Sequence, residues 1–189
     1  MDAPAEELAH LRLHNGTIWR WKRPLIGFNA QGEAHCRIEH RVVAAGPTPV
    51  DAIANTALFL GLFEALMRSS EPLESLLPFA VARDNFYAAA RHGLAAEVCW
   101  LGGACGSLGE LLSTRLLDMA VRGLEQAGLA AADARRWLDV IRARVSQRMT
   151  GADWQVAWIQ DHGRDFAAMV DNYAERQTSN TPVHEWSLK

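Results

Sequence analysis

The chain has 189 residues, of which 49% are hydrophobic, and its 19 Lys and Arg against 22 Asp and Glu give a formal net charge of -3. This length and apolar content predict a globular protein with one sizeable core. The net charge excludes an overall positive field, so we expect neither nucleic acid nor a membrane as a partner. Any anion that the protein binds must meet a local cluster of basic side chains.

Residues 1–13 predict a lead-in segment, and residues 14–189 predict a single domain. Within residues 14–46, polar and apolar side chains roughly alternate over residues 17–23 and 35–43. The segment GFNAQGE between them carries Gly27, Asn29 and Gly32, which are typical of turns. The sequence therefore predicts a β-hairpin here.

Residues 48–178 predict a helical portion. Thr48, Pro49 and Asp51 are typical of a helix start, with Thr48 as the N-cap. The helix that follows, to about residue 67, is apolar almost all round, which predicts a core helix buried on most sides. Its most apolar stretch, residues 52–63, is shorter than the ~20 residues that cross a bilayer.

Further helices are expected after this one, with a glycine-rich connector, LGGACGSLGE, in the middle of the chain. Capping-box patterns at Ser107 with Glu110 and at Thr150 with Asp153 mark two helix starts. The expected helical ranges are a short turn between Pro72 and Pro78, then 79–92, 108–127, 131–148 and 152–176. The fold class predicted is α+β, a small antiparallel sheet followed by about five helices. An isolated hairpin is only marginally stable in water, so we expect its strands to pack against the helices or against another chain.

The three cysteines, Cys36, Cys99 and Cys105, are odd in number and form no CxxC pair. This pattern favours reduced thiols and a cytoplasmic location. The sequence MDAPAEELAH at the N-terminus has neither the basic nor the apolar region of a signal peptide. We therefore expect a soluble, cytoplasmic protein.

Strand alternation within the hairpin gathers charged side chains on one face. On the second strand this set is His35, Arg37, Glu39 and Arg41. On the first strand one face holds Thr17, Trp19, Trp21 and Arg23.

Two interpretations of these charged residues stay open if the charged faces of the two strands coincide. The first is a solvated surface with cross-strand ion pairs, each worth at most ~1 kcal/mol. The second is a site where arginines bind phosphate or carboxylate and Glu39 holds a divalent cation.

The segment HNGTIWRWKRP, followed by the strand RIEHRV, resembles the C-terminal half of the glutamate-cysteine ligase family of plant and bacterial type, which includes related carboxylate-amine ligases. DNFYAAARHGLAAEV, TGADWQ and PVHEW are also similar to bacterial members of this group. The resemblance implies a glutamine-synthetase-like catalytic fold, in which a curved antiparallel sheet holds MgATP and substrates. It also implies the chemistry of glutathione biosynthesis: ATP phosphorylates a carboxylate, typically of glutamate, and an amine, typically of cysteine, attacks the acyl phosphate. Such phosphoryl transfer depends on positioning and charge stabilisation.

The resemblance also implies roles for particular residues. Glu39 matches the family's metal-binding glutamate, and Arg41 matches its phosphate-contacting arginine. Arg23 would hold a substrate carboxylate or a nucleotide phosphate, and Thr17 and Trp19 would line the same pocket.

Three further residues are candidates for contacting substrate or nucleotide, namely Arg37, Asn85 and Arg91. Arg37 shares the charged face of the hairpin, whereas the other two lie on the expected helix 79–92. An arginine near a helix end can instead cap carbonyls, and Asn85 can act as an internal cap.

The chain also departs from the family pattern. Family enzymes are longer, and their N-terminal half supplies further metal-binding glutamates. One glutamate cannot hold magnesium under a triphosphate, because hard cations need several oxygen ligands. We therefore expect either the C-terminal part of a longer ligase or a relative that completes its site with a partner, such as a second copy. The alternative is a non-catalytic binding or assembly module that keeps the scaffold and is inactive alone.

Overall fold

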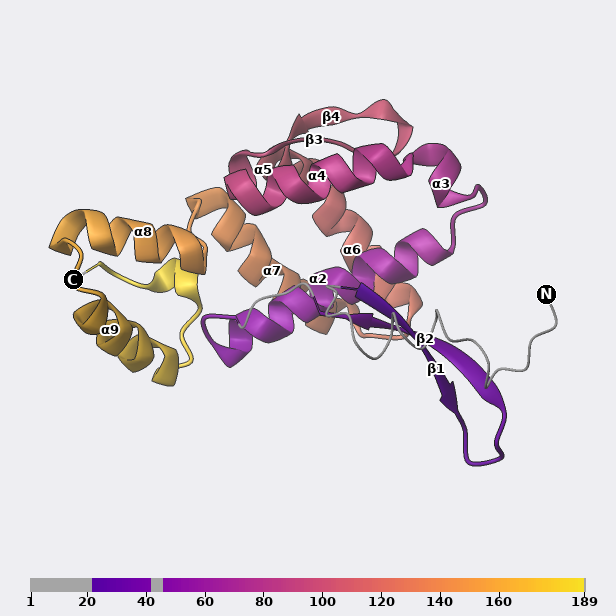
Figure 1. Ribbon diagram of the computed structural model, residues 1–189, viewed down its shortest axis with the longest axis horizontal. Coiled ribbons are helices and arrows are strands. Elements are labelled where there is room, and N and C mark those ends of the chain that lie inside the picture. The colour runs from indigo at the N-terminus through magenta and orange to yellow at the C-terminus, as the bar shows by residue number, and fades with distance from the viewer. Residues whose placement is uncertain (1–21, 42–45, 189) are drawn as a thin grey trace, which may run out of the picture. The chain divides into compact units, whose positions relative to one another are not determined.

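The protein is described by a computed structural model of the 189-residue chain. The structure describes residues 22–41 and 46–188, with side chains from residue 24 onward in the first range. The chain divides into two compact units, Met1–Ala45 and Gly46–Lys189 (Figure 1). The division falls between the predicted hairpin and the predicted helical portion.

The first unit contains an antiparallel hairpin of β1 (Lys22–Phe28) and β2 (Ala34–His40). Its turn is set by Asn29, whose side-chain oxygen accepts hydrogen bonds from the backbone N–H groups of Gln31 (3.0 Å) and Glu33 (2.9 Å). Such Asx-type bonds fix a turn locally. A hairpin is confirmed, but β1 runs on to Phe28 beyond the first strand expected over residues 17–23, of which 17–21 lie outside the described residues, so the turn is shorter than the segment GFNAQGE suggested.

The second unit is mostly helical (Figure 1). Its elements are α2 (Pro49–Met67), α3 (Leu73–Leu76), α4 (Phe79–His92), η2 (Gly93–Ala95), β3 (Glu97–Cys99), η3 (Leu101–Gly103), β4 (Cys105–Ser107), α5 (Leu108–Leu111), η4 (Leu112–Leu116), α6 (Leu117–Gln126), α7 (Ala131–Gln147), α8 (Gly151–His162), α9 (Phe166–Thr178) and η5 (Val183–Glu185). Over the described residues, two small antiparallel sheets accompany the helices. This composition agrees with the predicted α+β class.

Helix α2 begins as predicted, because Thr48 is its N-cap and accepts a hydrogen bond from the Asp51 N–H at 3.2 Å. By length and composition alone, the 19 residues of α2 could cross a membrane. The expectation that its apolar stretch is too short to do so is therefore wrong. The same test is passed by core helices of soluble proteins. Packing against α6 in the second unit is compatible with a soluble chain.

The contact between α2 and α6 depends on small residues. Ala54 and Ala57 are buried, and a Cβ on Gly61 would clash with the Ala120 carbonyl oxygen. Elsewhere on its surface α2 exposes large apolar side chains, namely Ile53, Leu60, Phe63 and Met67. The prediction of a helix buried on most sides is therefore wrong for the described structure, since most α2 side chains are at least partly exposed.

Most helices after residue 107 start at the capping residues that the sequence predicted. Ser107 accepts from the Glu110 N–H at 3.2 Å, and a continuous helical run with a π-helical segment, η4, follows to Gln126. Thr150 and Asp153 form a reciprocal capping box at the start of α8. The single helix expected over 152–176 is wrong. The chain breaks at Gly163, whose φ of 80° is left-handed, and α9 then starts anew.

The second unit has two apolar clusters. The larger one lies between α2, α6 and α7 and the segments around them. The smaller one joins α8 and the C-terminal segment through Trp154, Trp158, Val183 and Trp186. A buried ion pair, Asp51 with Arg144, links α2, α7 and η5, because Asp51 also accepts from the Val183 N–H at 3.1 Å.

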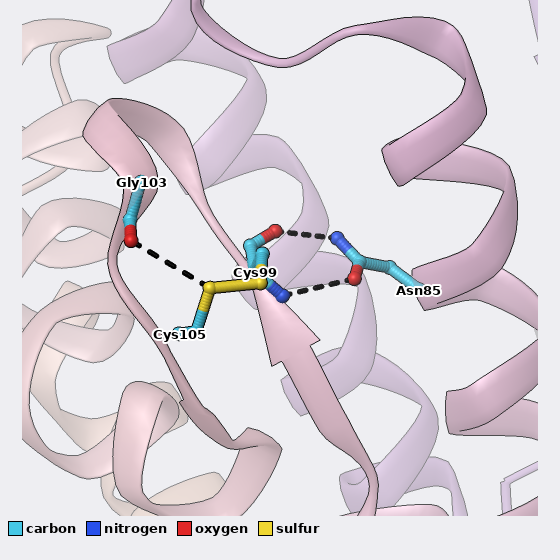
Figure 2. Close-up of a disulfide and its surroundings, with 4 residues drawn as sticks. All are labelled: Asn85, Cys99, Gly103 and Cys105. Carbon is cyan, nitrogen blue, oxygen red and sulfur yellow. Dashed lines mark hydrogen bonds between the residues drawn. A yellow bond between two sulfur atoms is a disulfide. The ribbon is translucent and has the colours of Figure 1, made fainter.

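The predicted connector LGGACGSLGE, together with the residues just before it, forms an unpredicted hairpin, β3–β4, closed by a disulfide between Cys99 and Cys105 (Figure 2). The prediction of three reduced thiols is wrong for these two, because the strand register places them directly opposite each other. Cys36 is an exposed free thiol. Since disulfides are uncommon in the cytosol, the cysteines no longer support a cytoplasmic location.

Replacing both bonded cysteines, Cys99→Ser with Cys105→Ser, should lower the free energy of unfolding by about 2 kcal/mol, the loop-closure entropy of so short a loop. Urea denaturation under non-reducing conditions measures this change. Cys36→Ser is the matched control and should stay within about 0.5 kcal/mol of the parent. An unchanged midpoint in the double variant would show that the disulfide does not stabilise the fold.

Candidate functional site

The hairpin register brings the predicted charged residues to one face. Directly opposite residues of an antiparallel pair share a face, and the pairs here are Arg23 with Glu39, Leu25 with Arg37, and Gly27 with His35. The position of Arg23 therefore lies across from Glu39, as required if the charged faces of the two strands coincide. Thr17 and Trp19 lie outside the described residues.

Gly27 gives two side chains room to cross the first strand. A Cβ at this position would lie 2.8 Å from His35 Nε2 and 2.9 Å from Arg37 Nη2. Both side chains therefore reach from β2 over the backbone of β1. Two potential hydrogen-bond donors for an anion lie together here.

Glu39 and Arg41 form an ion pair at the end of β2. Arg41 donates from Nε to Glu39 Oε1 at 3.0 Å, and its Nη2 donates to the same oxygen. Both side chains are partly exposed. The pair fits the alternation that places residues 39 and 41 on one side, and it holds the guanidinium in a defined orientation.

Among the residues that the structure describes, metal-ligating side chains form no cluster. Among them, no group of three or more His, Cys, Asp or Glu side chains could hold a metal ion. Magnesium takes about six oxygen ligands, several of them usually water or substrate phosphate, and the carboxylate on the charged face of the described hairpin, Glu39, accepts from Arg41 through Oε1. The described residues therefore supply at most part of the magnesium site that the family resemblance implies, and Glu39 as a metal ligand stays a prediction.

Asn85 and Arg91 lie in the second unit, on α4. The Asn85 side chain donates to the Cys99 carbonyl oxygen at 2.6 Å and accepts from the Cys99 N–H at 3.0 Å (Figure 2). Its amide is thus engaged in holding β3 beside α4. Arg91 is exposed in the last turn of α4, where a cation also suits the helix dipole.

Sequence reasoning missed a cleft of about 680 Å³ in the second unit. Its lining includes the carboxylates of Glu97, Glu110 and Asp153, the guanidinium of Arg148 and the imidazole of His92. These residues are spread over more than sixty positions and form no motif. The nearest sequence signals were the two predicted helix starts, which include Glu110 and Asp153; the structure shows an N-cap bond at the first and a reciprocal capping box at the second.

Comparisons with known proteins do not place the chain in a family. No protein-family model, no curated protein and no solved structure matches it.

Proposed function

We propose that this chain is part of an ATP-dependent carboxylate-amine ligase of glutamate-cysteine type, and that its hairpin belongs to a glutamine-synthetase-like catalytic sheet. The observation that carries the proposal is the register of β1 and β2. It sets Arg23 across from Glu39, with Arg37 on the same face and Arg41 bonded to Glu39. The sequence resemblance supports the same assignment.

In this proposal the arginines bind anions. Arg41 contacts a transferring phosphoryl group, and Arg23 and Arg37 hold a phosphate or the substrate carboxylate. Bidentate guanidinium contacts suit both groups, and fixed positive charge stabilises the charge that develops in phosphoryl transfer. Glu39 orients Arg41 through their ion pair.

Further metal ligands besides Glu39 come from elsewhere in this account, because the described residues hold no group of three or more metal-ligating side chains. Over those residues β1 and β2 pair only with each other, so each strand has an edge without a described partner strand. Such edges accept further strands. We propose that another polypeptide segment or a second subunit supplies those strands and the remaining carboxylates. Use of ATP suggests the cytoplasm, although the Cys99–Cys105 disulfide would be uncommon there.

The test compares the 189-residue chain alone with the protein in its native assembly. Given MgATP, L-glutamate and L-cysteine, the assembly should form ADP and a γ-glutamyl product, whereas the chain alone should form neither because its metal ligands are incomplete. A coupled ADP assay with product detection by mass spectrometry gives both readouts. Full activity from the isolated chain would refute the incomplete site, and an assembly that binds neither MgATP nor L-glutamate by calorimetry would refute the ligase.

The second candidate is a non-catalytic binding or assembly module. The hydrogen bonds between the Asn85 side chain and the Cys99 backbone favour this candidate. They show that a residue expected to contact substrate instead holds two structural elements together. If the chain is such a module, we expect a defined oligomer in sedimentation experiments and no heat of binding for MgATP or L-glutamate in calorimetry. An assembly that consumes ATP would exclude it.

A further inference from the structure

The cleft in the second unit has the size and lining of a small-molecule site. Its volume of about 680 Å³ lies within the range of roughly 300–1,000 Å³ that is typical of such sites. Leu94, Ala95 and Val145 give it an apolar part. The ends of α4 and α7 and the starts of α5 and α8 supply the polar rim.

Two of the carboxylates that line the cleft, those of Glu97 and Glu110, belong to neighbouring local structure. Glu97 pairs with Ser107 across the β3–β4 hairpin, and Ser107 caps the backbone N–H of Glu110. Neither carboxylate has a hydrogen bond or ion pair to any residue that the structure describes. Asp153 differs, because its carboxylate accepts from Thr150 in the capping box.

A guanidinium lines the cleft from the end of α7. Arg148 has a φ of 50°, in the left-handed region that usually holds glycine after a helix. Its side chain has no hydrogen bond or ion pair to the described part of the chain. The cleft therefore presents acceptors for a cation and donors for an anion, all available to a ligand.

We propose that this cleft binds a free amino acid or short peptide with an apolar side chain. The ammonium group contacts Glu97 and Glu110, the carboxylate contacts Arg148, and the side chain packs on the apolar part. A metal ion does not suit the cleft, since no metal-holding group occurs over the described residues. A polyphosphate does not suit it either, because the excess of carboxylates repels it. This inference is independent of the ligase proposal.

Backbone amide NMR of the 189-residue chain, titrated with glycyl-L-leucine, tests the inference. Signals of Leu94, Ala95 and Val145 should shift in a saturable way. Blocking either end, as N-acetyl-glycyl-L-leucine or glycyl-L-leucinamide, should weaken binding about tenfold or more, since each block removes a charge-assisted contact.

Substitutions in the cleft test which side chains contact the ammonium end and which contact the carboxylate end of the peptide. Glu97→Gln with Glu110→Gln should abolish the preference for the free ammonium, and Arg148→Gln should abolish the preference for the free carboxylate. The matched controls are Glu74→Gln and Arg122→Gln, exposed residues outside the cleft, which should bind like the parent. Absence of saturable shifts, equal binding of the blocked peptides, or parent-like preferences in the cleft variants would overturn the proposal.

Discussion

Asp51→Ala should lower the free energy of unfolding by about 3–5 kcal/mol, because it leaves the Arg144 guanidinium buried without its counter-charge. The Asp51 side chain is fully buried, and its Oδ1 lies 3.2 Å from Arg144 Nη2. Its other oxygen accepts from Thr48 Oγ1 at 2.9 Å and from the Val183 N–H at 3.1 Å. The change therefore also removes the bond that ties the C-terminal segment to α2.

Burial is the larger influence on Arg144. It lowers the pKa of this arginine, and the Asp51 carboxylate acts in the opposite direction. The guanidinium also donates to Asn55 Oδ1 at 2.8 Å and to the Asp51 carbonyl oxygen at 3.1 Å, so it cannot move to solvent without breaking both bonds. A charge held in this way is costly once its partner is removed.

Chemical denaturation followed by circular dichroism measures the effect. The matched control is Asp139→Ala, which removes an exposed ion pair of Asp139 with Arg142 and should cost less than about 1 kcal/mol. The double variant Asp51→Ala with Arg144→Met should recover part of the loss, since it removes the stranded charge. If Asp51→Ala does not fold, Asp51→Asn provides a milder variant that keeps acceptor atoms. Equal stabilities for Asp51→Ala and Asp139→Ala would show that the buried pair does not stabilise the fold.

Arg41→Gln should reduce the ligase activity of the native assembly by about 10²–10³-fold, the cost of removing one preorganised donor from a developing charge. The decrease should appear in kcat more than in KM, because the contact is proposed to be strongest in the transition state. Arg41 is partly exposed, so stability should change by less than about 1 kcal/mol.

The control is Arg68→Gln, an exposed arginine whose ion pair with Glu64 resembles the local pair of Arg41 with Glu39. It should keep parent-like kcat and KM. If both variants keep full activity, Arg41 has no role in phosphoryl transfer.

Local sequence signals predicted much of the backbone. Nearest neighbours in the chain set the N-caps at Thr48 and Ser107, the capping box before α8 and the hairpin turn at Asn29. Such signals need no knowledge of tertiary contacts. For the same reason the alternation of β2 correctly placed residues 37 and 39 on one side of the strand.

The features that were missed depend on contacts between distant or weakly patterned segments. A glycine-rich stretch resembles a loop, and only the register of β3 and β4 places Cys99 opposite Cys105. The cleft gathers residues from several helix ends, so no spacing pattern marks it. The break at Gly163 was hidden because helical periodicity continues on both sides of it.

The central claim is that the charged face of the β1–β2 hairpin binds a polyphosphate. NMR of the arginine side-chain Nε–H signals, in the 189-residue chain titrated with tripolyphosphate at low ionic strength, tests it most directly. Tripolyphosphate should shift the Arg37 and Arg41 signals, and Arg41→Gln should weaken the shift at Arg37. Shifts confined to arginines of the second unit, or no shift of any arginine, would contradict the claim.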